Sequence, residues 1–343
     1  MKKRINQILS GLLVGAMIFA LSGCGKDSGT AGAAEGTDGL TKVRLAVMTN
    51  GFDHYLAVVA LEQGIFEKYG LDVEMTEYGR GINTIDAVVN GTADIGNMAD
   101  YATVNRLGNT LHDTNLVIFS EQSGGSVQNG GLYVAPEFVD NLQALDGSKG
   151  FISILGTVSD YQTSVAIEYL GLDEAKQNII AADSQQTSLA LAQNNEASAI
   201  YTSGSAGAYF EKFGWKQAVT SQELGIRTYG YFLTTREYNE NNTETLAKFL
   251  QASQDSFDYI KANLEDTGKF LEAKIGIKAE DFVNNWSSIT SNIGFTQDGA
   301  DHLQTMEEWA FAHGRFPESY NVKDFINTDA AKLAFPERVT LEQ

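Results

Sequence analysis

The sequence predicts an α/β fold arranged in two lobes. Short β-rich runs alternate with helical patterns along most of the chain, and the alternation restarts after the Gly/Ser/Asn-rich stretch Ser123–Gly131. Such alternation is typical of mainly parallel sheets covered by helices. The roughly 300 residues that follow the N-terminal segment are enough for two such units, each with its own buried core.

The first series of elements lies before this stretch. Its predicted strands are Val43–Met48, Val73–Thr76, Asp94–Asn97 and Leu116–Ser120. Its predicted helices are Tyr55–Phe66, Asn83–Asn90 and one that starts near Asp100. Each strand is short and rich in β-branched or apolar residues, which favours strands buried under helices.

The second series repeats the pattern. Its predicted strands are Leu132–Ala135 (closed by Pro136), Phe151–Leu155, Ile179–Ala181, Ala199–Tyr201 and Tyr231–Thr234, with a helix over Ser159–Leu170. A long amphipathic helix is predicted from about Glu244 to Asn263, because apolar side chains recur there at helical spacing. The last part of the chain is mostly helical, with a helix over Ala300–His313 that Gly314 and Pro317 end.

The N-terminus has the features of a bacterial secretion signal. Lys2, Lys3 and Arg4 precede the apolar run Ile8–Leu21, which is shorter than the ~20 residues of a membrane-spanning helix. The run ends in Leu21-Ser22-Gly23-Cys24, which resembles a lipobox, and Cys24 is the only cysteine of the chain. Lipidation explains this lone thiol; the alternative is an ordinary cleaved signal with an incidental cysteine.

The segment after Cys24 fits an anchored protein. Gly25–Thr41 consists mainly of small and polar residues, too few of them apolar to build a core. Such a tether behaves as a flexible coil, and two acyl chains would hold it stably. We therefore expect a signal peptide over residues 1–23, a lipidated cysteine and tether over 24–41, and a location on the extracytoplasmic face of the cell membrane.

The net negative charge of the chain argues against binding partners that are themselves strongly acidic. The formal net charge is −20, and removal of the signal would make the rest still more acidic. Such a surface repels phosphate backbones and anionic lipid, so nucleic acid is not an expected partner. The charge is explained by solubility outside the cell.

Four segments in order carry a family resemblance. The string Leu56–Val73 matches "A-x-E-x-G-x-F-x-x-x-G-L-x-V" through Ala60, Glu62, Gly64, Phe66, Gly70, Leu71 and Val73. Asn90–Gly96, Gly156–Asp160 and Tyr231–Tyr238 match three further motifs. In this order, over about Val43 to Asn263, the chain resembles the solute-binding proteins of the nitrate/sulfonate/taurine and thiamine-pyrimidine group of ABC transporters.

The resemblance implies a periplasmic-binding-protein type II fold with the ligand in a cleft between the lobes. Lobe 1 would comprise 42–128 plus 236–343, and lobe 2 would comprise 129–235. It implies a monomer that delivers a small organic solute to a permease and uses no cofactor or metal. The expected solute is a sulfonate or a taurine-like zwitterion, and the alternative is a thiamine-pyrimidine or another nitrogen heterocycle. An enzyme of the pyrimidine-synthase branch is the rival class.

Candidate ligand-binding residues follow the strands, because ligands of open α/β sheets bind outside the carboxyl ends of strands. In lobe 1 they are Asn50, Phe52, Asp53, His54, Arg80, Asn97, Asp100, Tyr101 and Gln122. In lobe 2 and the return segment they are Thr157, Ser159, Asp160, Tyr161, Tyr201, Thr202 and Tyr229. Amides, hydroxyls and phenols suit the capture of a small polar solute by hydrogen bonds.

Alternative roles exist for several of these residues. Arg80 is the one strong cation of these loops and could bind an oxyanion, or it could be a solvated surface arginine. Asp53, Asp100 and Asp160 could receive an amine, but each stands where a helix begins and could cap it instead. The tyrosines could line the cleft or pack in the core. We find no nucleotide-binding or hydrolase motif, and the cysteine is used by the anchor, so we expect no catalysis.

Overall fold

The structure is a computed structural model that describes residues 39–49, 51–110, 115–124, 129–286 and 289–342. The predicted signal peptide, Cys24, most of the tether and Asn50 lie outside the described residues. Among the helices of the described ranges, none has the length and apolar character needed to cross a membrane.

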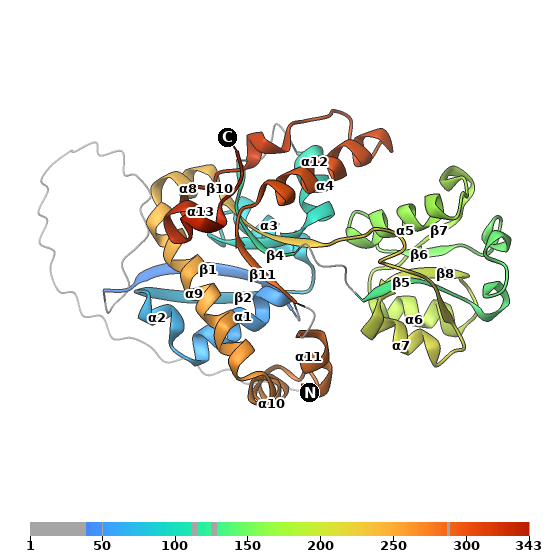
Figure 1. The fold of residues 1–343 in the computed structure, drawn as a ribbon, viewed down its shortest axis with the longest axis horizontal. Coiled ribbons are helices and arrows are strands. Elements are labelled where there is room, and N and C mark those ends of the chain that lie inside the picture. Colours follow the sequence, from blue (N-terminus) through green and yellow to red (C-terminus); the bar gives the residue numbers. More distant parts are fainter. Residues whose placement is uncertain (1–38, 50, 111–114, 125–128, 287–288, 343) are drawn as a thin grey trace, which may run out of the picture. The chain divides into compact units, whose positions relative to one another are not determined.

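Two sets of strands form the framework (Figure 1). In the first, β1 (Thr41–Met48) pairs in parallel with β2 (Leu71–Tyr78), and the strands β11-β4-β10-β3 form a four-stranded sheet. These four are β3 (Gly96–Ala99), β4 (Leu116–Gly124), β10 (Tyr229–Thr235) and β11 (Ser291–Gly294). A parallel bridge between Leu45 and Ile95 joins the two sheets, and we call this part of the fold lobe 1.

Lobe 2 is built on a five-stranded sheet in the order β7-β6-β8-β5-β9. Its strands are β5 (Gly130–Val134), β6 (Phe151–Ser153), β7 (Ile179–Ala181), β8 (Ala199–Ser203) and β9 (Lys216–Thr220). Strand β6 runs parallel to both of its neighbours, the edge strand β7 and the central strand β8. Their carboxyl ends therefore meet at one edge of the sheet, the place where ligands bind in such sheets.

Most strands of each lobe run in one direction, as the alternation predicts, but antiparallel strands are inserted among them. The return strand β10 lies antiparallel between β3 and β4, and β5 lies antiparallel to both β8 and β9. The reason is topological, because a strand that enters a sheet from the other lobe approaches from the opposite end. The pairing also places β10 in the sheet of lobe 1, although the predicted boundary after 235 assigned it to lobe 2.

Helices cover both sheets. In lobe 1 the longer ones are α1 (Phe52–Glu62), α3 (Gly81–Val89), α4 (Asp100–Asn109), α9 (Thr243–Ala262), α10 (Leu264–Ile275), α11 (Ala279–Trp286) and α12 (Gln297–Ala312). Shorter ones are α2 (Ile65–Lys68), α8 (Arg236–Asn241) and α13 (Asp329–Ala334). Lobe 2 has α5 (Val158–Tyr169), α6 (Gln185–Gln193), α7 (Gly204–Glu211) and the short 3-10 helix η3 (Glu174–Lys176).

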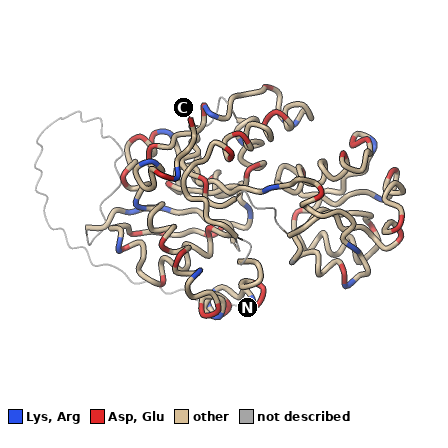
Figure 2. The backbone as a smooth tube through the Cα atoms, viewed as in Figure 1, with Lys and Arg blue, Asp and Glu red and all other residues tan. Residues whose placement is uncertain are grey.

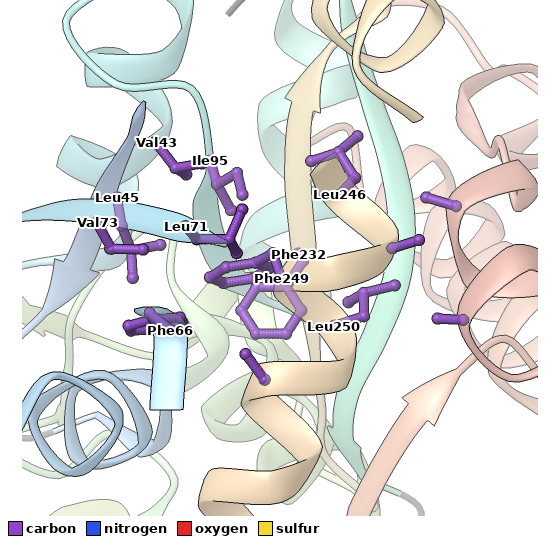
Figure 3. Close-up of a cluster of buried hydrophobic side chains, with 14 of the residues drawn as sticks. Val43, Leu45, Phe66, Leu71, Val73, Ile95, Phe232, Leu246, Phe249 and Leu250 are labelled. Carbon is purple, nitrogen blue, oxygen red and sulfur yellow. The ribbon is translucent and has the colours of Figure 1, made fainter. Parts of the chain in front are cut away.

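The apolar face of α9 forms the centre of the lobe 1 core, as the amphipathic pattern predicts. Leu246, Phe249 and Leu250 are at most 2% exposed. Figure 3 shows the Phe249 ring against Phe232, on the side of α9 where Leu71 and Phe66 lie. The Phe249 ring stacks on Phe66 at 6.0 Å between centroids and meets Phe232 edge-on at 5.2 Å. Burial of such side chains contributes roughly 1.5–3 kcal/mol each, so this seam fixes α9 on the sheet.

Several element boundaries differ from the predictions for local reasons. The helix expected over Tyr55–Phe66 is two helices, because Gly64 adopts a left-handed φ of 63° between them. Strands β9 and β11 were not predicted; β9 is half exposed and β11 has four residues, so neither has a clear apolar pattern. Helix α12 begins at Gln297 rather than Ala300, because Thr296 caps it.

The distribution of charged residues over the fold reflects the acidic composition of the chain. In the tube view the Lys and Arg positions are scattered among more numerous Asp and Glu positions (Figure 2). The described part of the chain therefore presents no continuous basic stripe of the kind that nucleic-acid-binding surfaces have.

Candidate functional site

Three adjoining cavities lie at the carboxyl ends of the lobe 2 strands. The first, which we call the lobe 2 cavity, has a volume of about 320 Å³. The second, the Arg80 cavity, measures about 900 Å³ and is lined by both lobes. The third, the α11 cavity, measures about 980 Å³. Gln185, at the start of α6, lines all three, so they adjoin one another, and we call them together the cleft.

The lobe 2 cavity is polar but carries no charged side chain among its described lining residues. Its polar lining residues are Asn129, Ser153, Ser159, Gln162, Gln185, Ser188, Tyr201, Thr202, Ser203, Ser221 and Thr228. The apolar remainder comes from residues such as Ile152, Ile200 and Phe210. A small ligand here would meet hydroxyl and amide groups on apolar walls, which is the usual composition of a small-molecule site.

Two hydroxyls of this cavity have no hydrogen-bond partner. Ser153, in β6, is 1% exposed, and its Oγ makes no hydrogen bond. Thr228, on the return segment, likewise has a buried Oγ1 without a partner. An unsatisfied buried hydroxyl costs about 1–3 kcal/mol, so such groups are expected where a ligand completes them.

Three helices start at the lobe 2 cavity, and each is capped by a hydroxyl. Thr157, Ser184 and Ser203 accept hydrogen bonds from the first-turn N–H groups of α5, α6 and α7 at 3.2, 3.2 and 3.4 Å. Helix N-termini carry a partial positive charge. Their convergence gives the cavity a preference for a negatively charged group without any lysine or arginine in its wall.

A glycine shapes the turn that leads into α5. Gly156 adopts a left-handed φ of 72° between β6 and α5, and its N–H donates to Oδ2 of Asp160 at 3.1 Å. Asp160 also lies 3.8 Å from the Arg315 guanidinium. Asp160 therefore holds the turn before α5, whereas Thr157, and not Asp160, is the N-cap of the helix.

The Arg80 cavity combines a polar rim with an apolar floor. From lobe 1 it is lined by Arg80, Asn97 and Asn105, and from lobe 2 by Thr157, Asp183 and Gln186, among others. Its apolar lining includes Met48, Ile82, Met98, Ile154, Leu155 and Leu189. The hydrogen bond from Thr187 lowers the pKa of Asp183, and the Arg80 charge contributes in the same direction.

Seven of the predicted residues line the cleft. Asn97, Arg80 and Thr157 line the Arg80 cavity, Ser159, Tyr201 and Thr202 line the lobe 2 cavity, and Phe52 lines the α11 cavity. Phe52 also stacks on Trp286 at 5.2 Å, so its ring continues the lobe 1 core into the cleft wall. The structure thus brings together residues from both lobes that are up to 150 positions apart in the sequence.

Asp100 is buried and serves the packing of lobe 1. It is 0% exposed; its carboxylate accepts the Tyr229 N–H at 2.8 Å and lies 2.9 Å from His302 Nε2. Tyr229 in turn donates its hydroxyl to Asp298 at 2.5 Å. Neither of these two predicted site residues lines the three cavities, because they bind the return strand to α4 and α12.

Asp53, His54 and Gln122 are likewise buried away from the cavities. Asp53 accepts the Met48 N–H at 3.0 Å, and burial raises the pKa of its carboxyl to about 7. His54 lies 3.2 Å from the Glu77 carboxylate. Gln122 is 2% exposed in β4. The first turn of α1 and the end of β4 thus contribute packing rather than cavity lining in this structure.

Tyr101 and Tyr161 meet each other between the lobes. Their rings stack at 5.5 Å, and Tyr161 meets Trp309 of α12 edge-on at 4.9 Å. Burial raises the pKa of Tyr161 to about 12, so it stays neutral. Both tyrosines join an aromatic contact between lobes, beside the cleft rather than in its wall.

Sequence reasoning missed part of the lining. Asp183, Ser184 and Gln185 follow β7 directly, and the strand-end rule would have found them if it had been applied to Ile179–Ala181. Ser153 and Thr228 carry no such signal, since Ser153 lies inside a predicted strand and Thr228 precedes a strand instead of following one. Only the tertiary structure shows that their hydroxyls face a cavity.

The sequence comparison assigns the family. The NMT1/THI5-like family matches residues 51–266, which is more than half of the chain. The chain belongs to the NMT1/THI5-like family. No curated protein matches it in sequence.

Solved structures of low sequence identity share the fold of this chain. The alkanesulfonate-binding protein SsuA from Xanthomonas axonopodis pv. citri, bound to MOPS, superposes with a TM-score of 0.69 at 13% identity, over 86% of this chain and 100% of that one. The aliphatic sulphonate-binding protein SsuA from Escherichia coli gives 0.71 at 15%, over 83% and 97%. The nitrate-binding protein NrtA from Synechocystis PCC 6803 gives 0.67 at 15%, over 88% and 91%. The chain thus has the two-lobed fold of periplasmic binding proteins.

Proposed function

We propose that this protein is a solute-binding lipoprotein of an ABC importer that captures a small organic anion in the interlobe cleft. The observation that carries the proposal is the lobe 2 cavity, an uncharged polar site with three helix N-termini and two unpaired hydroxyls. Neutral donors and helix ends suit an oxyanion that stays ionised at all physiological pH values, as a sulfonate does. The structural relatives named for sulfonate and nitrate binding support the same class.

The Arg80 cavity would hold the rest of the solute. Its apolar floor of Met48, Ile82 and Met98 suits a short alkyl chain, and its polar rim suits an amine or hydroxyl at the far end. A sulfonate or a taurine-like zwitterion therefore fits the two cavities together. The expected contact of Arg80 is with the outer part of such a solute, because Arg80 does not line the lobe 2 cavity.

A thiamine-pyrimidine or another nitrogen heterocycle is the second candidate. The observation that favours it is Asn97, which lines the Arg80 cavity and has a buried Oδ1 without a hydrogen-bond partner. An amide oxygen of this kind could accept a hydrogen bond from an aminopyrimidine. An enzymatic role is the rival class, and a desulfurization enzyme with a TM-score of 0.65 at 9% identity has the same fold.

A binding experiment tests the proposal. Calorimetry with methanesulfonate, taurine, nitrate and a 4-aminopyrimidine should give one strong binder and no product by mass spectrometry. A solute at 100 times its dissociation constant should add about 2.7 kcal/mol of stability. Consumption of a solute with stoichiometric product would support the enzyme class instead, and preferred binding of the aminopyrimidine would support the second candidate.

Ser153→Ala distinguishes a ligand-binding hydroxyl from a structural one. The hydroxyl is buried and unpaired, so its removal should raise the free energy of unfolding by up to about 1 kcal/mol. If the hydroxyl binds the anion, the same variant should lose roughly tenfold in affinity. Lower stability with unchanged affinity would contradict this placement of the anion.

Anchoring and delivery are separate parts of the proposal. We propose that Cys24 carries the lipid and that a permease receives the solute from the anchored protein. Cys24→Ala should move the protein from the membrane fraction to the soluble fraction without a change in solute affinity. A variant that stays membrane-bound as tightly as the wild type would contradict the anchor.

A further inference from the structure

Apart from the cleft, the described lobes also meet along one face of α5. Arg315 lies 3.8 Å from Asp160 in the first turn of α5. Arg315 and His313, just after the end of α12 in lobe 1, also contact two further carboxylates of lobe 2, Glu174 in η3 and Glu168 in α5. We call these four residues the interlobe latch. They do not line the three cavities, so no role in solute contact follows for them from the geometry.

The Arg315 half of the latch is the better enclosed. Arg315 Nη2 donates to Oε1 of Glu174 at 2.6 Å and to Oγ of Ser164 at 2.9 Å, and Ser164 itself donates to Glu174 at 2.6 Å. The side chains of Arg315 and Glu174 are only 26% and 24% exposed. A charge-assisted pair with this geometry is stronger than an exposed surface pair, which contributes little.

The His313 half is held in place from two sides. One ring nitrogen, Nε2, lies 2.6 Å from Oε1 of Glu168, and the other, Nδ1, lies 2.7 Å from the Trp309 carbonyl. The Trp309 indole N–H donates to Glu168 at 3.4 Å. The stacked rings of Tyr101 and Tyr161 lie beside this group and contact Trp309.

Helix α5 connects the latch to the cleft. Its first turn lines the lobe 2 cavity through Val158 and Ser159, and its later turns carry Ser164 and Glu168. The distance along the axis from Ser159 to Glu168 is only about 13 Å at 1.5 Å per residue. A helix of this length moves as one rigid element, so the contacts at its far end determine where its N-terminus stands relative to lobe 1.

We infer that the interlobe latch positions the N-terminus of α5 against lobe 1 and thereby raises the affinity for the solute, an inference that rests on the proposed function. The Arg80 cavity is lined by both lobes in the arrangement that the latch holds. A solute that contacts both lobes binds most tightly to that arrangement. Residues that increase the population of this arrangement lower the apparent dissociation constant without touching the solute.

A double-mutant cycle tests the latch. Arg315→Gln and Glu174→Gln should each weaken the binding of the tightest solute of the calorimetric screen roughly tenfold, mainly through faster dissociation. The double variant should bind about as well as Arg315→Gln alone, because Glu174→Gln breaks a contact that Arg315→Gln has already removed. Affinities within twofold of the wild type, or fully additive losses, would overturn the inference.

Arg106→Gln is the matched control. Arg106 pairs with Asp86 at 2.9 Å inside lobe 1, and its side chain is 21% exposed, close to the value for Arg315. This variant removes a comparable ion pair that does not connect the lobes. It should leave the affinity unchanged within twofold; an equal loss would show that the effect of Arg315→Gln is not specific to the interlobe contact.

A distance measurement separates failure of the latch from failure of the proposed function. Spin labels at Lys68→Cys in lobe 1 and Glu196→Cys in lobe 2, in a Cys24→Ala background, report the interlobe distance without any solute. The wild type should give one narrow distribution, and Arg315→Gln should broaden or lengthen it. An unchanged distribution would overturn the latch even if no solute of the screen bound.

Discussion

The two lobes use polar residues in different ways. Lobe 1 buries several carboxylates, among them Asp53, Asp100 and Glu121, and most of these oxygens accept hydrogen bonds from the protein itself. The lobe 2 cavity has no charged side chain in its described lining, yet it keeps hydroxyls without partners. Buried polar atoms without partners also occur in the lobe 1 core, for example at Trp286, but those of Ser153 and Thr228 line a cavity and can be completed by a ligand.

This difference between the lobes indicates which polar residues contact the solute. A charge near a strand end attracts attention in the sequence, but the carboxylates of Asp100 and Glu121 in lobe 1 contact the return strand and the start of α12 rather than the cleft. In lobe 2 the signal is a hydroxyl that lines a cavity and has no partner, as at Ser153, which only coordinates can show. The following predictions test this contrast, from the largest expected effect to the smallest.

Asp100→Ala should cause the largest loss of stability. The variant leaves His302 and the Tyr229 N–H without their buried partner, so the free energy of unfolding should fall by about 3–5 kcal/mol. Urea denaturation measures it. Asp86→Ala, which removes a side chain that is 43% exposed, should cost less than about 1 kcal/mol. A comparable loss in both variants would break the contrast between structural and surface charges.

The stability of the protein should fall as the pH rises from 5 to 8. Burial raises the pKa of Glu121 to about 7, above the ordinary value of 4.5, and Asp53 shifts in the same direction. Between the ordinary pKa and the raised pKa of Glu121, the native state binds more protons than the unfolded chain. The protonated carboxyls therefore stabilise the fold at low pH, and this stabilisation is lost as the pH rises through 7. Glu121→Gln should remove roughly 2 kcal/mol of this dependence.

The solute affinity should not follow this pH dependence. The described lining of the lobe 2 cavity contains no carboxylate, imidazole or amine that could titrate between pH 5 and 8. Denaturation and calorimetry over the same pH series measure both quantities. An affinity that changes tenfold in parallel with the stability would mean that the solute contacts the buried carboxylates of lobe 1.

Ser159→Ala should lower the solute affinity and leave the stability nearly unchanged, the reverse of what Asp100→Ala does. Ser159 lines the lobe 2 cavity at the first turn of α5, so the variant should lose roughly tenfold in affinity, or about 1.4 kcal/mol, with little change in the denaturation midpoint. Thr305→Ala, which removes an exposed hydroxyl of α12 outside the cleft, serves as the control and should change neither quantity. Unchanged affinity in Ser159→Ala would place the anion outside the lobe 2 cavity.

Arg80→Ala should have the smallest effect. Arg80 is exposed and lines only the outer Arg80 cavity, so its loss should weaken sulfonate binding less than threefold. Calorimetry at low and at physiological salt measures it, since a screened contact should vanish at the higher salt. A loss of a hundredfold would mean that Arg80 pairs with the anion directly and would reverse the assignment of the two cavities.

The sequence by itself determined the fold class and most elements. The alternation of strands and helices and the amphipathic face of α9 follow from the periodicity of apolar residues, which can be read in a short window of sequence. The family motifs are also local. The strand-end rule also found seven lining residues, because the direction of a strand and its end can be read along the chain.

The tertiary structure decided which polar residues face the cleft and which face the core. Asp100 and Ser159 both follow a strand and both stand at a helix start, yet one meets Tyr229 and His302 and the other meets a cavity. The antiparallel insertion of β10 and the latch between Arg315 and Glu174 also depend on partners more than a hundred residues away. Contacts between distant segments depend on the path of the chain between them, and no local sequence pattern specifies that path.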